Sequence, residues 1–141
     1  MNINKFTQKS IEAINNCQNI ISEYGNQYVE QIHLLYSLIT IDDSLIAQLL
    51  KKMGVPMEQF KSSLTDEISR LPKVSGAGQM YFSQGANLAL TKAEEHAKSM
   101  GDEYVSVEHI FLSLMKEADP TLKKLFQQYG ITKDGFLKAL A

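Results

Sequence analysis

A chain of 141 residues with 44% apolar and 21% charged residues has the composition of a folded globular protein, which excludes an intrinsically disordered chain. Its net charge of −2, with scattered basic residues, excludes the concentrated basic surface of a nucleic-acid-binding protein. The longest apolar stretch, at 34–41, is too short to cross a bilayer, and the N-terminal residues lack the apolar core of a secretory signal. The single cysteine, Cys17, allows no internal disulfide, so we expect a cytoplasmic protein. From the charge and the short apolar stretches we expect it to contact neither nucleic acid nor membrane.

The apolar periodicity predicts four helices in residues 1–70. Thr7 is expected to cap the first helix, because its hydroxyl can accept a hydrogen bond from an unpaired backbone N–H. Gly25 suits the left-handed conformation that ends a helix. A short extended piece at 28–29 then leads into a second helix, which carries the apolar run 34–39.

The third and fourth helices are indicated by similar signals. Asp43 is expected to cap the third helix, and Gly54 to end it. The fourth helix is marked by apolar residues spaced four apart, namely Phe60, Leu64 and Ile68. No segment alternates between apolar and polar residues over a useful length, so the sequence predicts an all-α protein.

Residues 71–81 are predicted to form a loop, because Pro72, Gly76 and Gly78 interrupt the helical pattern. The glycine-containing segment 75–78 has no strand before it, so we interpret it as a connector rather than a phosphate-binding loop. The loop is too short and too apolar at its ends to be a free linker. We therefore expect the segments on either side of it to pack together.

Residues 82–141 repeat the first part of the chain. An offset of 76 residues aligns the two segments without a gap and matches glycines, aromatic residues and histidines: Phe6/Phe82, Gly25/Gly101, Tyr28/Tyr104, His33/His109, Gly54/Gly130 and Phe60/Phe136. Ser83 and Asp119 are the expected caps in the second copy. We predict a tandem duplication of a four-helix unit, packed with pseudo-two-fold symmetry. The whole chain, 1–141, would then be a single domain, with repeat one at 1–70, the connector at 71–81 and repeat two at 82–141.

Four residues could in principle carry chemistry. His33 and His109 occupy equivalent positions near helix starts, but a metal site needs three or four converging donors, and the sequence indicates none. We expect each histidine to fix the turn before its helix by a hydrogen bond. His96 and Cys17 align with Ile20 and Ala93, and are interpreted as a partly buried histidine and a small core residue. With no nucleophile or phosphate-loop motif either, we expect no catalytic residue, no metal site and no cofactor in this domain.

Binding is better supported than catalysis. Two helical units packed side by side would leave a groove between them, and such junctions favour ligand binding. Asp102 and Glu108 flank the start of a helix in the second copy, where acidic groups complement the helix dipole or contact a ligand. The pattern alone supports these two interpretations equally, and Thr7 likewise can cap its helix and also line a site.

The repeated stretches GNQYVEQIHLLYSLI and GDEYVSVEHIFLSLM, the opening KFTQKSIEAI and the connector RLPKVSGAG resemble the N-terminal domain of the Clp ATPases. The resemblance covers essentially the whole chain. It is most similar to the ClpB branch, the bacterial disaggregases, at six connector residues: Arg70, Leu71, Pro72, Val74, Gly76 and Gly78.

The resemblance implies that the domain captures unfolded or aggregated polypeptide in an apolar groove between the repeats. In ClpB relatives the polar positions beside the groove match Thr7, Asp102 and Glu108, and an apolar groove position matches Leu90. The full-length protein would be a hexameric AAA+ ring that uses ATP and magnesium and works with the DnaK system. The present sequence contains no Walker motif, so the ATPase activity is expected outside it.

Two alternatives stay open. A ClpC- or ClpA-type domain would bind adaptors or substrates for a protease, whereas an architectural helical repeat would bind no client. ClpC-type domains that recognise phosphorylated arginine use an acidic residue in both repeats. Here Glu108 has Ile32 as its counterpart, which weakens any transfer of that specificity.

Overall fold

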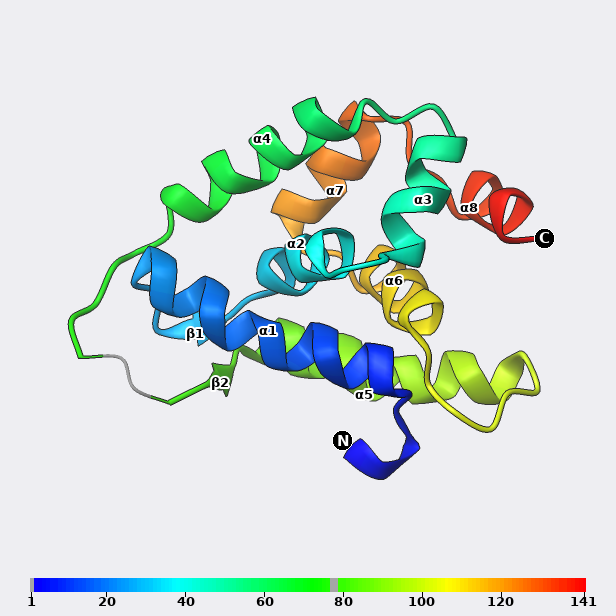
Figure 1. The fold of residues 1–141 in the computed structure, drawn as a ribbon, viewed down its shortest axis with the longest axis horizontal. Helices are drawn as coiled ribbons and strands as arrows, with labels where there is room; N and C mark the ends of the chain where they lie inside the picture. Colours follow the sequence, from blue (N-terminus) through cyan, green and yellow to red (C-terminus); the bar gives the residue numbers. More distant parts are fainter. Residues whose placement is uncertain (1, 77–78) are drawn as a thin grey trace.

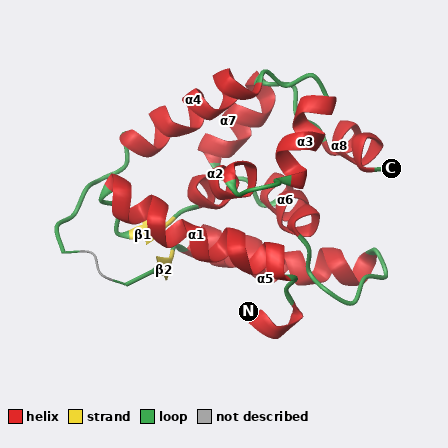
Figure 2. Ribbon diagram, in the orientation of Figure 1, coloured by secondary structure: helices red, strands yellow, loops and turns green. Residues whose placement is uncertain are grey.

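The computed structural model describes residues 2–76 and 79–141. The first part of the chain forms a short 3-10 helix and four α-helices: η1 (Ile3–Lys5), α1 (Gln8–Tyr24), α2 (Gln31–Thr40), α3 (Leu45–Lys52) and α4 (Met57–Ser69). The second part forms four more: α5 (Gln84–Ser99), α6 (Val107–Lys116), α7 (Pro120–Gln128) and α8 (Lys133–Leu140) (Figure 1). Figure 2 shows how completely helices dominate the described part of the chain. The predicted all-α fold with a duplicated four-helix unit is confirmed, whereas the connector residues Ala77 and Gly78 lie outside the described residues.

The helix ends follow the expected side-chain chemistry at most positions. The side chains of Thr7, Ser83 and Asp119 each accept a hydrogen bond from the backbone N–H three residues further on, which confirms these three predicted caps. Gly25 ends α1 in the left-handed conformation, with a φ angle of 70°.

The prediction that Asp43 caps α3 is wrong by one residue. Ser44 is the cap, and its Oγ accepts a hydrogen bond from the backbone N–H of Ala47 at 3.0 Å. Asp43 instead forms part of the preceding turn, with a φ angle of 52°. The residue of repeat two that aligns with Ser44 is Pro120, which has no side-chain acceptor, so the cap there is Asp119.

The two repeats exchange short extended segments. Strand β1 (Tyr28–Val29) of repeat one pairs in parallel with strand β2 (Tyr81–Phe82), which precedes α5. In the same way Phe6, which precedes α1, forms a parallel bridge with Val105 of repeat two. Phe6 and Phe82 are related by the repeat offset, and so are Val29 and Val105. We call this arrangement the reciprocal strand pairing; it expresses the predicted pseudo-two-fold symmetry in backbone contacts.

Helices α2 and α6 lie in the centre of the molecule, where they contact each other and several surrounding helices (Figure 1). They are the equivalent helices of the two repeats, and both are buried over most of their length. This explains why their sequences are apolar nearly all round rather than along one stripe. Over the described ranges, no helix combines the length and apolarity required to span a bilayer.

Candidate functional site

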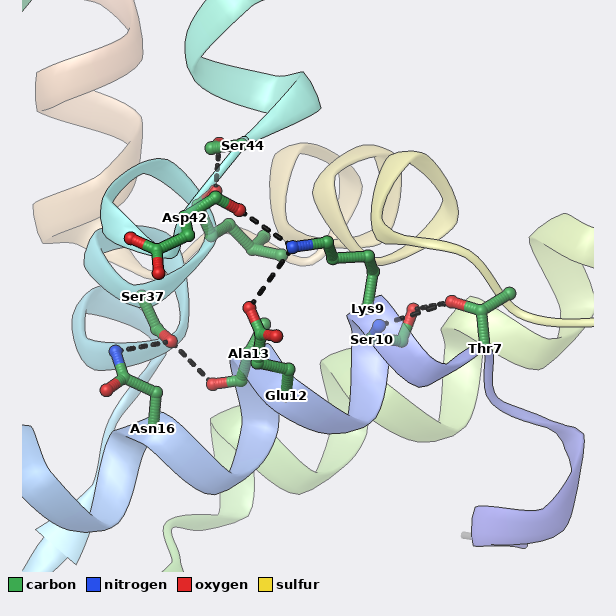
Figure 3. A network of polar contacts seen from close by, with 10 residues as sticks. Thr7, Lys9, Ser10, Glu12, Ala13, Asn16, Ser37, Asp42 and Ser44 are labelled. Atoms are coloured by element: carbon green, nitrogen blue, oxygen red, sulfur yellow. Dashed lines mark hydrogen bonds and ion pairs between the residues drawn. The ribbon is translucent and has the colours of Figure 1, made fainter.

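Thr7 lies against the loop that precedes α6. Its backbone N–H donates to the carbonyl oxygen of Val105 at 3.0 Å, and the Ser10 hydroxyl donates to the same oxygen at 2.9 Å. The Thr7 hydroxyl donates to Ser10 Oγ at 3.0 Å, as Figure 3 shows. Thr7 therefore joins the start of α1 to the loop that carries Asp102 and leads into α6, where Glu108 lies.

Asp102 and Glu108 line one small pocket of about 280 Å³, which we call the polar pocket. The rest of its lining consists of Glu103, Tyr104, Ser106 and His109. Thr7 is hydrogen-bonded to Val105, which lies between Asp102 and Glu108 in the sequence. The structure thus brings three of the four predicted site residues into one region.

A histidine fixes the turn beneath this pocket. His109 Nδ1 accepts a hydrogen bond from the backbone N–H of Ser106 at 2.9 Å, so the ring proton lies on Nε2. That nitrogen lies 2.8 Å from Asp102 Oδ2 and donates to it. In repeat one His33 makes the same pair of contacts, with the backbone N–H of Glu30 at 2.8 Å and with Asn26 Oδ1 at 2.9 Å. The structural role predicted for both histidines is confirmed.

The connector lines the equivalent pocket of repeat one. It measures about 140 Å³, and Leu71, Pro72 and Val74 form part of its wall. The Val74 N–H donates to the carbonyl oxygen of Gly25 at 2.8 Å, and the Asn26 side-chain amide donates to that of Pro72 at 3.3 Å. The two repeats therefore share a pocket position, and the pocket is smaller in repeat one, where the connector forms part of its wall.

Leu90, the fourth predicted site residue, belongs to the core. It has no exposed surface, and it shares the buried face of α5 with four alanines: Ala86, Ala89, Ala93 and Ala97. Leu88, two residues earlier and on the opposite face, is 42% exposed. The assignment of Leu90 to a ligand-lining position is therefore corrected, because α5 turns this side chain inward.

Side chains of the two repeats contact each other at two places along the seam where the groove is expected, and the groove itself stays a prediction. Gln31 of α2 is buried there, and its side-chain amide donates to the carbonyl oxygens of Gly85 at 3.1 Å and Glu117 at 2.8 Å. Farther along the seam, the rings of Phe60 and Tyr129 pack edge to face with centroids 5.0 Å apart. These contacts join repeat one to repeat two directly.

A larger hollow lies within repeat two, among α5, α6, α7 and α8. We call it the repeat-two hollow; its volume is about 610 Å³. Its apolar walls come from five side chains: Leu112, Met115, Ala118, Phe126 and Ile131. Polar and basic side chains complete its lining: His96, Lys116, Lys123, Gln127 and Lys133. The sequence predictions missed this hollow, although aligning the copies shows that its three lysines replace the uncharged residues Thr40, Ala47 and Met57.

His96 is half-buried at the edge of the hollow, as expected for the residue that aligns with Ile20. Burial lowers its pKa, and the positive charges of Lys116 and Lys133 lower it further. Cys17, the other candidate for chemistry, is buried in the core, where desolvation raises the pKa of its thiol to about 12. In the part of the chain that the structure describes, no three acidic, histidine or cysteine side chains converge as metal ligands would.

Comparison with known proteins places the chain among chaperone domains. It is 37% identical to the chaperone protein ClpB of Nitratidesulfovibrio vulgaris and 35% identical to that of Clostridium tetani, in each case over 99% of this chain. The chain spans only 17% of the length of either relative.

Solved structures share the fold. The Hsp104 N-terminal domain from Candida albicans superposes with a TM-score of 0.83 at 24% identity, covering 96% of this chain and 88% of that one. A ClpV N-domain, solved in complex with a VipB peptide, superposes with a TM-score of 0.77 at 23% identity, covering 99% of this chain and 86% of that one. The sequence model of the Clp repeat (R) N-terminal domain matches residues 5–129, and the chain belongs to this family.

Proposed function

We propose that the chain is the polypeptide-binding N-terminal domain of a ClpB-type chaperone and has no catalytic site of its own. Unfolded or aggregated polypeptide would be captured in the repeat-two hollow. The observation that carries this proposal is an open hollow of about 610 Å³ whose walls are mainly apolar. Concave apolar surfaces of this size are where proteins commonly bind ligands.

The relatives support this proposal. The identity to ClpB chaperones extends over nearly the whole chain, which favours a ClpB-type domain over a ClpC- or ClpA-type one. The complex of the ClpV N-domain with a peptide shows that another domain with this fold binds polypeptide. Thr7, Asp102 and Glu108 are proposed as a second, polar contact region for the client.

The physics of the hollow suits transient capture. Apolar burial contributes about 25 cal/mol per Å², so a few side chains in the hollow would contribute several kcal/mol before ordering costs are subtracted. The longer protein would be a cytoplasmic hexameric ring that hydrolyses ATP with magnesium and cooperates with the DnaK system. Several N-terminal domains in such a ring could engage one aggregate and raise the overall affinity.

The test is a titration of a fluorescently labelled unfolded polypeptide with the domain, using the variant Met115→Glu. Met115 is half-buried in the wall of the hollow, so a carboxylate there should weaken binding about tenfold, because one apolar contact is lost and a charge meets apolar client side chains. Met57→Glu is the matched control, because Met57 is also a half-buried methionine but lies in repeat one, outside the hollow.

Backbone NMR on the same samples locates the bound client. Chemical-shift changes should centre on residues of α6 and α7 that line the hollow. Equal weakening by both variants, or shift changes confined to the polar pocket, would contradict the assignment of the hollow. Absence of binding by the unaltered domain would leave an architectural role as the better description.

A further inference from the structure

Three lysines surround the mouth of the repeat-two hollow. Lys116 comes from the end of α6, Lys123 from α7 and Lys133 from the start of α8, and all three are exposed. Within residues 2–76 and 79–141, none of the three forms an ion pair. Their charges are therefore available to a bound molecule.

We call these three lysines the basic rim, and they occur in repeat two alone. The residues aligned with the three lysines in repeat one are Thr40, Ala47 and Met57. Of the described residues that line the hollow, none carries a carboxylate. The chain as a whole has a net charge of −2, so the positive charge of this lining is opposite in sign to the net charge of the chain.

The basic surface extends beyond the hollow. A smaller depression of about 350 Å³ shares Lys116, Lys133 and His96 with it and adds Lys92. Glu95 also lines this depression and lies 3.4 Å from Lys92, so that one pair is internally balanced. A ligand in the hollow would thus have apolar walls beneath it and ammonium groups on several sides.

We propose that the repeat-two hollow selects polypeptide segments in which apolar side chains are flanked by aspartate or glutamate. The proposal rests on the proposed function, because it specifies which clients the hollow prefers. Apolar client side chains fill the space between Leu112, Met115 and Phe126, while client carboxylates reach the lysines at the rim. Each exposed charge pair contributes little, but three lysines acting together favour an acidic segment over a basic one by about tenfold.

The experiment uses labelled peptides of equal length with one shared apolar centre, flanked by glutamate, by glutamine or by lysine. Fluorescence anisotropy with the 141-residue chain should give the tightest binding for the glutamate-flanked peptide and the weakest for the lysine-flanked one. The difference should shrink as salt is added, because screening acts on exposed charges and not on apolar contacts.

Two triple variants separate the local rim from the overall charge. Replacing Lys116, Lys123 and Lys133 by glutamine should abolish the preference, so that this variant binds the three peptides with equal affinity. Replacing Lys5, Lys51 and Lys98 by glutamine removes the same number of charges from exposed positions outside the hollow and should leave the preference intact.

Each remaining outcome contradicts one of the two proposals. If no peptide binds, the proposed function fails. If all three peptides bind alike, the hollow binds apolar segments and the charge preference is wrong. If both triple variants lose the preference equally, net charge rather than the rim attracts the acidic peptide, which also overturns the inference.

Discussion

The two equivalent histidines differ in one neighbour. His33 donates to the neutral amide of Asn26, whereas His109 donates to the carboxylate of Asp102. His33 has no exposed surface, and desolvation lowers its pKa from 6.5 to about 4. A buried neutral imidazole of this kind links the stability of the fold to pH.

We predict that the domain loses stability as the pH falls from about 6.5 towards 4. In that window the unfolded chain protonates His33 and the folded chain does not, so protons favour unfolding, with a slope of up to about 1.4 kcal/mol per pH unit. Above the unfolded pKa the contribution is fully present. Urea unfolding at several pH values measures the slope, and His33→Gln should reduce it relative to the unaltered chain. An identical slope in the variant would show that other groups cause the acid sensitivity.

At the scale of helices, the duplicated units differ in how α3 and α7 begin. Ser44 caps α3 in repeat one, because its hydroxyl accepts a backbone N–H hydrogen bond. The aligned Pro120 has no such acceptor, and Asp119 caps α7 instead. Asp43 is thereby released from capping and takes a left-handed conformation that glycine would adopt more easily.

Ser44→Ala should therefore lower the free energy of unfolding by about 1 kcal/mol, because the first turn of α3 loses its side-chain acceptor. Asp43→Gly should leave stability unchanged or raise it slightly, because the strained φ angle is relieved. Thermal melts of both variants measure the effects. A larger loss for Asp43→Gly than for Ser44→Ala would indicate that Asp43 is the cap after all.

Much of this element-level architecture is readable from sequence, because caps, stops and periodicity act locally. Thr7, Gly25 and the spacing of Phe60, Leu64 and Ile68 all predict helix limits correctly. The burial of Leu90 and the contacts of Gln31 could not be predicted in this way. Both depend on contacts between segments that are distant in the chain. The hollow could not be predicted from local patterns, since its walls come from four different helices, α5 to α8, and depend on how those helices pack together.

At the scale of the whole molecule, the reciprocal strand pairing ties each repeat to the other. Backbone hydrogen bonds run from Thr7 to Val105 in one direction and from Ser83 to Val29 in the other. The buried amide of Gln31 adds further contacts across the seam. Each repeat thus completes its fold with backbone groups of its twin.

We predict that fragments 1–76 and 79–141, produced together, assemble into one folded domain, and that neither fragment folds alone. The reason is that each fragment by itself would expose the central helix, α2 or α6, that its twin covers. Co-purification and dispersed NMR spectra of the mixture, compared with each fragment separately, measure this. A well-dispersed spectrum from a single fragment would show that a repeat is an independent folding unit.

The smaller pocket of repeat one has a consequence for valency. Leu71, Pro72 and Val74 of the connector line it, and its volume of about 140 Å³ is half that of the polar pocket in repeat two, about 280 Å³. A client group that fits the polar pocket would therefore find less room at the equivalent position of repeat one. Avidity would then come from several copies of the domain in one assembly rather than from the two halves of a single copy.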